Sequence, residues 1–200
     1  MDVMIGVADA MPRRPGAPES PPGTRFHDGV AVREHTFRIA DTVSATIGAG
    51  DLPVVTGDDS AILLGCLAGA GRHERTGLVH IGGGADFRHP GNHDFTEPGA
   101  AADSSLALAT GRGELLLTDW PGTLVADRDV VRVGDDDGTP LPFPTIGVTV
   151  PATTARRVIE LLPDVPALWI HVNGDVPGVL TVLRETGRVV GISITTGSRS

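Results

Sequence analysis

The stretch Gly77-Leu-Val-His-Ile-Gly-Gly-Gly-Ala-Asp-Phe-Arg88 decides how the rest of the sequence is interpreted. Its apolar run, Leu78 to Ile81, is short and ends at three glycines, a pattern typical of a buried strand that opens into a loop. In open α/β sheets, ligands bind in the crevice outside the carboxyl ends of the strands. We therefore expect the loop from Gly82 to Asp86 to border the functional site of this protein.

Short apolar runs alternate with helical patterns on both sides of this stretch. Further strands are expected at 3–8, 29–32, 52–55, 167–172 and 189–194, and residues 115–117, 130–133 and 145–150 form three more short apolar runs. Helical spacing predicts helices over 35–47, 61–70 and 100–110, from Pro151 to about residue 162, and over 179–184.

Strands that alternate with helices imply a mostly parallel sheet that is covered on both faces. We predict a single three-layer α/β/α domain that spans residues 1–200, a length that allows a sizeable core. Residues 1–35 should contribute an N-terminal strand and a loop rich in Pro and Gly. The core should extend over about residues 36–195.

The amino-acid composition limits the classes of partner that we expect for this protein. The net charge is −9, and Arg supplies all 16 basic residues. Nucleic acids and anionic membranes both select a basic surface, so we expect neither as a partner. A single cysteine, Cys66, excludes an internal disulfide. With no signal-peptide pattern and no run of ~20 apolar residues, the expected location is the cytoplasm.

Three strand ends, taken together, resemble the arginase/agmatinase family of ureohydrolases. Val54-Val-Thr-Gly-Asp-Asp-Ser-Ala-Ile62 is similar to the family's strand–GGDHS–helix segment, and the stretch 77–88 is similar to its strand–DAHxD segment. Leu168-Trp-Ile-His-Val-Asn-Gly-Asp175 is similar to its strand–DxD segment, and residues 99–113 resemble the helix after its substrate loop. The order and approximate spacing agree over residues 50–195. This resemblance implies an arginase-like fold.

Members of this family hold two manganese ions with two histidines and four aspartates, and the ions activate a water that attacks a guanidinium carbon. The resemblance places Asp86 and Asp175 at ligand positions, and Asp59 at a position that supports the site. Four other ligand positions carry Ser60, Gly82, Gly84 and Asn173. Two carboxylates and a neutral amide are a poor donor set for two divalent ions. We therefore expect no metal, no other cofactor, and no guanidine hydrolysis by the family's mechanism.

If the fold is right, Asp59, Asp86 and Asp175 converge at the carboxyl edge of the sheet. Crowded carboxylates raise one another's pKa, so one of them could act as a general acid or base. His80 and His171 precede Gly82 and Asn173 by two residues, which places each imidazole on the same sheet face as the residue that replaced a ligand. The candidate catalytic residues are Asp86, Asp175, His171 and Asp59. The candidate substrate-binding residues are Ser60, His80, Gly82, Gly84, Asn173 and His93.

Each of these residues also has a structural interpretation. Asp59 could cap a helix, and the two histidines could be hydrogen-bonded core residues. His89, His93 and Asp94 could form a mononuclear metal site, although Pro90 and Gly91 exclude a helix there. The three glycines could instead expose backbone N–H groups to a phosphate.

We expect a metal-independent enzyme that acts on a small polar metabolite by elimination, cyclisation or isomerisation, in a biosynthetic side pathway. The alternative is a catalytically inactive homologue that serves as a binding module or as a regulatory subunit of an active relative. Because ureohydrolases commonly form trimers or hexamers, the resemblance implies a homo-oligomer. Assembly with an active relative is the second possibility.

Overall fold

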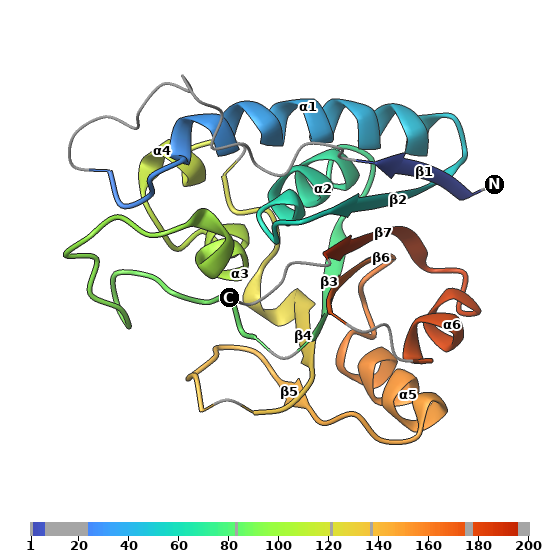
Figure 1. Cartoon of the computed structure of the whole chain (residues 1–200). Coiled ribbons are helices and arrows are strands. Elements are labelled where there is room, and N and C mark those ends of the chain that lie inside the picture. The colour runs from blue at the N-terminus through green and yellow to red at the C-terminus, as the bar shows by residue number, and fades with distance from the viewer. Residues whose placement is uncertain are drawn as a thin grey trace.

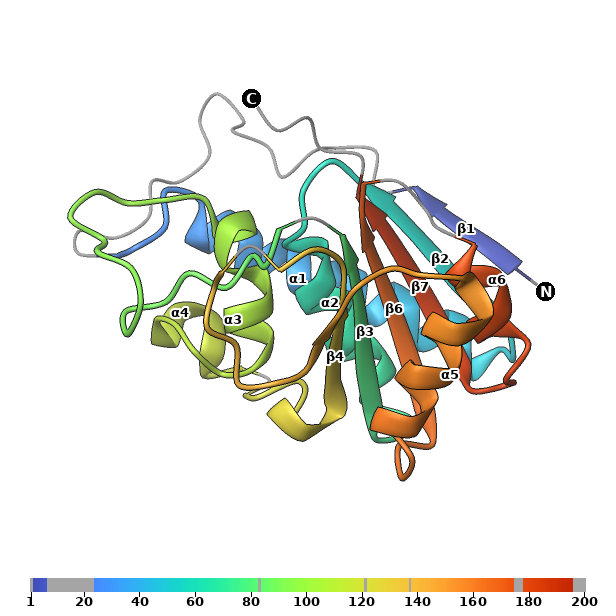
Figure 2. The ribbon, with the colours of Figure 1, turned by 90° about the horizontal axis from the view of Figure 1, so that it is seen from below.

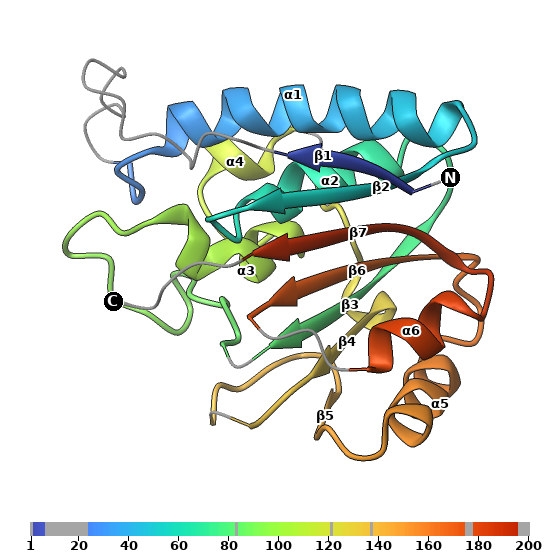
Figure 3. The same cartoon turned by 45° about the vertical axis from the view of Figure 1, so that its right-hand side comes forward.

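A seven-stranded parallel sheet forms the centre of the computed structural model, which describes residues 2–6, 24–82, 84–120, 122–136, 138–174 and 178–195. The strand order is β1-β2-β7-β6-β3-β4-β5, and every neighbouring pair is parallel. The strands are β1 (Asp2–Gly6), β2 (Leu52–Gly57), β3 (Thr76–Gly82), β4 (Val130–Val133), β5 (Thr145–Ile146), β6 (Ala167–Asn173) and β7 (Val189–Thr195). In Figure 3 the arrows of β1, β2, β7, β6 and β3 point the same way, and since β4 and β5 are parallel to them, the carboxyl ends of the strands share one edge.

Helices cover both faces of this sheet (Figures 1 and 2). One face carries α1 (Gly29–Gly48), α2 (Ile62–Ala70), α3 (Ser105–Ala109) and α4 (Leu115–Thr118), and the other carries α5 (Pro151–Leu161) and α6 (Val179–Arg184). Two short 3-10 helices, η1 (Ala101–Ser104) and η2 (Asp127–Asp129), complete the elements. No helix in the described ranges is long and apolar enough to cross a membrane.

Alternate residues of the central strands pack into two separate cores. Leu78 and Trp169 belong to the core under α1 and α2, whereas Val79 and Ile170 belong to the core under α5 and α6. A parallel strand that is buried on both faces has apolar residues at successive positions, which is why these strands appear as short continuous apolar runs. The predicted three-layer α/β/α architecture is confirmed.

Glycines in α2 allow this helix to pack closely against α1. A Cβ at Gly65 would lie 2.9 Å from the backbone oxygen of Thr36, and one at Gly69 would lie 2.7 Å from that of Ala40. A larger side chain at either position would push the two helices apart. The turn between β2 and α2 is thereby held over the carboxyl edge of the sheet.

The structure corrects one expected strand and shows what two of the apolar runs form. Residues 29–32 are the first turn of α1, not a strand: the β-branched Val32 donates its N–H to the Asp28 oxygen at 2.9 Å, one helical turn back. The apolar run 115–117 lies in helix α4. The apolar run 145–150 forms a strand only as far as Ile146, the last of its residues that pairs with β4. Of the strand expected at 3–8, residues 7 and 8 lie outside the described ranges.

Candidate functional site

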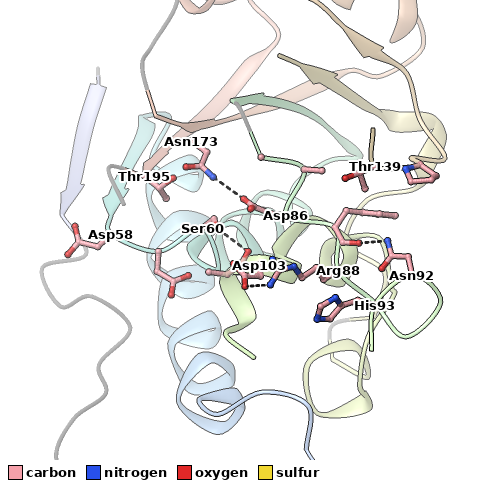
Figure 4. A pocket seen from close by; sticks show the side chains of 16 residues that line it. Asp58, Ser60, Asp86, Arg88, Asn92, His93, Asp103, Thr139, Asn173 and Thr195 are labelled. Carbon is pink, nitrogen blue, oxygen red and sulfur yellow. Dashed lines mark hydrogen bonds and ion pairs between the residues drawn. The ribbon is translucent and has the colours of Figure 1, made fainter. Parts of the chain in front are cut away.

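A cavity of about 730 Å³ opens at the carboxyl edge of the sheet (Figure 4). Its walls come from the turn after β2, the loop after β3, η1, the segment after β4, and the ends of β6 and β7. Its lining residues are Asp58, Asp59, Ser60, Gly84, Ala85, Asp86, Phe87, Arg88, Asn92, His93, Ala102, Asp103, Thr139, Pro140, Asn173 and Thr195. This volume suits a small metabolite.

Asp86 occupies a strained position at the centre of this cavity. Its φ is +44°, the only positive value among the described residues other than glycine. Such a conformation costs about 1–3 kcal/mol and persists where its surroundings enforce it. Here the Asp86 backbone oxygen accepts the N–H of Leu106 at 3.0 Å, and the Asn173 amide donates to Asp86 Oδ2 at 2.9 Å. Figure 4 shows this contact between the loop after β3 and the end of β6.

Asp59 lies across the cavity, in the turn that precedes α2. Burial raises the pKa of Asp59 to about 6, and the nearby carboxylates of Asp28, Asp86 and Asp103 add to the increase. A hydrogen bond from the Ala61 N–H to Asp59 Oδ1, at 2.7 Å, acts in the opposite direction. Asp59 therefore supports the turn before α2 and is also able to exchange a proton near neutral pH.

Asp59→Asn should stabilise the protein at pH 7.5 by about 1 kcal/mol, after allowance for the partial exposure of the side chain. Because its pKa is higher in the folded than in the unfolded chain, Asp59 binds more protons when folded between about pH 4 and pH 6. Stability is therefore lost as the pH rises through this window. Urea unfolding at pH 4 and pH 7.5 measures the effect; a variant that gains equal stability at both values would contradict it.

The cavity wall carries an excess of negative charge. Four aspartates line it (Asp58, Asp59, Asp86 and Asp103), whereas Arg88 is the one basic residue among the lining positions that the structure describes. Arg88 pairs with Asp103 at 2.7 Å. An acidic, partly enclosed wall concentrates cations. The cavity is therefore suited to a positively charged ligand.

Two further lining residues have partners within the protein. The Ser60 hydroxyl donates to the Ala102 backbone oxygen at 3.1 Å, which ties the turn after β2 to η1. His93 lies at the exposed rim, with its ring edge-on to Phe95 at 4.9 Å between centroids. Ser60 is thus a structural link, and His93 is the imidazole that faces the cavity.

His80 and His171 are fully buried below this cavity and do not line it. They are partners in the β3–β6 register, and their ring centroids lie 5.1 Å apart. His171 Nδ1 lies 2.8 Å from the Ser193 hydroxyl, which also accepts the Trp169 N–H at 2.9 Å. Burial lowers the pKa of both histidines, that of His80 to about 4 with help from Arg132, and that of His171 with help from His80. Both imidazoles are therefore neutral near pH 7.

The fold brings together six of the candidate residues that the sequence identifies. Asp59, Ser60, Gly84, Asp86, His93 and Asn173 line one cavity, whereas His80 and His171 are buried below it and Gly82 is not among its lining residues. Asp175 lies outside the described residues.

Other lining residues carry little or no signal in the sequence. Asp103 belongs to residues 99–113, which resemble the helix after the family's substrate loop. This resemblance was the hint in the sequence that Asp103 lies near the site. Nothing in the sequence marks Thr139 or Thr195, because their proximity to Asp86 depends on strand order.

The donor atoms at this edge do not fit a two-metal centre. A Cβ at Gly82 would overlap the Asn173 backbone oxygen, so a bridging carboxylate at residue 82 requires a different backbone. The Asn173 amide is neutral and donates its N–H to Asp86, so it does not supply the bridging carboxylate that two ions share. No group of three His, Cys, Asp or Glu within the described ranges is placed to hold a metal ion. Two bridged divalent ions need shared carboxylates, which the described residues at this edge do not offer.

No protein-family model matches this sequence, and no curated protein matches it either. Solved structures do match its fold. Bacillus caldovelox arginase aligns with a TM-score of 0.75 and 17% identity, covering 92% of this chain and 73% of the arginase. Entamoeba histolytica arginase, solved with L-ornithine, aligns with a TM-score of 0.73 and 18% identity over 92% and 74% of the two chains.

Proclavaminate amidino hydrolase from Streptomyces clavuligerus aligns more weakly, with a TM-score of 0.57 and 14% identity over 82% of this chain and 61% of that one. The predicted arginase-like fold is thus confirmed, and the low identity agrees with extensive divergence. At this identity the comparison establishes the fold and leaves the chemistry to the residues themselves.

Proposed function

We propose that this protein is a metal-independent enzyme that acts on a small cationic metabolite by acid–base chemistry. The proposal rests on two carboxylates, those of Asp59 and Asp86, which line the same cavity in different surroundings. Asp59 has a pKa of about 6, and Asp86 is held in a strained backbone conformation by Asn173. A carboxyl with a raised pKa in a cavity, as at Asp59, is typical of acid–base sites.

The geometry suggests a division of roles between the two carboxylates. Asp86 would bind the cationic group of the substrate, and the acidic wall would favour its entry. Asp59, in its carboxylate form, would take a proton from an atom adjacent to the bound cationic group. The same carboxyl would then return that proton elsewhere on the molecule, or to a leaving group. This cycle consumes no co-reactant and yields an isomerisation, an elimination or a cyclisation.

A second candidate is a binding module without turnover. The observation that favours it is the burial of His80 and His171, which leaves the described cavity wall with His93 at its rim as its imidazole. A cavity with few bases can hold a cation without transforming it. The alternative therefore predicts affinity for cations with no proton exchange.

Deuterium exchange distinguishes the two candidates without knowledge of the product. Wild-type protein would be incubated in D2O at pH 7 with a panel of diamines, guanidines and cationic amino acids, L-ornithine among them, while NMR follows C–H signals and calorimetry measures affinity. We expect at least one compound to bind and to exchange a proton. Asp59→Asn should slow that exchange by roughly 10²–10⁴-fold while binding is retained.

The control variant is Asp41→Asn, which removes an exposed carboxylate from α1 that pairs with Arg72 and does not line the cavity. It should leave both affinity and exchange unchanged. Binding without exchange or product would favour the binding module. Absence of affinity for every cationic compound would contradict both candidates.

A further inference from the structure

His80 is a polar residue in a place where an apolar one would be more stable. Its side chain is 0% exposed, and neither ring nitrogen has a hydrogen-bond partner within the described part of the chain. A buried polar group left without a partner costs about 1–3 kcal/mol. Such groups are rare in folded proteins, and each one calls for an explanation.

The His80 ring lies directly behind the carboxylate that faces the cavity. His80 Nε2 is 4.0 Å from Asp86 Oδ2, the same oxygen that accepts the Asn173 amide. Asp86 follows β3 in a left-handed conformation, so its side chain turns back over the end of the strand that carries His80. A hydrogen bond between these two atoms requires them to approach by about 1 Å.

Burial and the guanidinium of Arg132 oppose the protonation of His80. Arg132, fully buried on β4, is its partner in the strand register on one side, and His171 on β6 is its partner on the other. Cys66 on α2 lies in the same core, beside Ser193. Burial and Arg132 lower the pKa of His80, so the ring stays neutral and carries a single N–H.

We propose that His80 is a positioning residue for Asp86, donating its Nε2–H to Asp86 Oδ2 from inside the sheet. The functional meaning of this contact rests on the role proposed above for Asp86 as the cation-binding carboxylate. Asn173 and His80 then hold one oxygen of that carboxylate from two directions, which keeps the side chain in one orientation before a ligand arrives. Preorganisation of this kind lowers the cost of binding.

The tautomer of His80 tests the proposal on the ligand-free, full-length protein. Long-range ¹⁵N–¹H NMR at pH 7 distinguishes a proton on Nε2 from one on Nδ1, and Asp86→Asn should move the His80 signals more than Asp59→Asn does. We expect the Nε2–H form. The Nδ1–H form would overturn the proposal, because an Nε2 lone pair cannot donate to a carboxylate.

Two variants distinguish a role of His80 in positioning Asp86 from a role in filling the core. His80→Leu removes the donor, whereas His80→Gln retains an amide N–H. We expect the ¹³Cγ signal of Asp86, assigned by its loss in Asp86→Asn, to shift in His80→Leu and to return at least halfway in His80→Gln. An unchanged Asp86 signal in a folded His80→Leu would overturn the proposal. Neither measurement requires a substrate, so the outcome is independent of the deuterium-exchange test.

Discussion

Gly82→Asp, which restores a carboxylate at a ligand position of the ureohydrolase family, should destabilise this protein by about 4 kcal/mol and create no metal site. The φ of Gly82 is +149°, a value that side chains other than hydrogen rarely allow. A Cβ there would overlap the Asn173 backbone oxygen and lie 3.1 Å from the Asn173 Cβ. A Cβ at Gly134, on the other side, would in turn overlap the Gly82 oxygen. The strand ends at this edge are packed backbone to backbone.

The matched control is Gly99→Asp. Gly99 has an ordinary φ and open space around its Cα, so the same chemical change there should alter the free energy of unfolding by no more than about 0.5 kcal/mol. Urea unfolding followed by circular dichroism compares the two variants, and calorimetry with Mn²⁺ tests for metal binding. Equal stability of the two variants, or stoichiometric Mn²⁺ binding by Gly82→Asp, would contradict the prediction. Either result would show that the backbone at this edge can move to accept a side chain at residue 82.

Trp169→Ala should lower the free energy of unfolding by about 4 kcal/mol, the cost of removing a large buried side chain that its neighbours cannot replace. The ring is 0% exposed in the core under α1 and α2, and it fills the space over Gly191 on the adjacent strand. Its N–H also donates to the Ser193 hydroxyl, which contacts His171. Truncation therefore leaves a cavity and removes one of the hydrogen bonds of the Ser193 hydroxyl below the candidate site.

Trp169→Phe separates these two contributions, because it keeps an aromatic ring and removes the N–H. We expect it to cost about 1–2 kcal/mol, mostly from the lost hydrogen bond and a small residual cavity. Thermal and urea unfolding of both variants provide the measurement. If Trp169→Phe were as unstable as Trp169→Ala, the hydrogen bond to Ser193 and not ring packing would dominate the stability of this region.

Much of the architecture follows from the sequence alone. The apolar runs that became β3, β4 and β6 and the helical pattern of α6 were predicted within one or two residues. The prediction of these elements succeeded because the alternation of short apolar runs with amphipathic segments is a local property of the chain. The order of three strand-end segments indicated an arginase-like fold even though no segment was intact and four of the six ligand positions were altered.

The local hydrophobic pattern was not enough to predict secondary structure where tertiary packing overrides the intrinsic propensity of the residues. The valines of residues 29–32 favour a strand, yet they begin α1 because Val32 is buried there against the core. Residues 115–117 are apolar but helical, since α4 packs beside α1 and leaves Leu115 at the surface. In both segments the contacts that decide the conformation come from residues far away in sequence.

The sequence by itself determined which chemical groups stand at the carboxyl edge: carboxylates at residues 59 and 86, an amide at 173, and glycines in place of metal ligands. Only the tertiary structure decided what those groups do to one another. Strand order sets His80 behind Asp86 and keeps both histidines out of the cavity, and burial beside other carboxylates raises the pKa of Asp59. Residue identity is local information, whereas distance, burial and electric field depend on segments that meet only when the chain is folded.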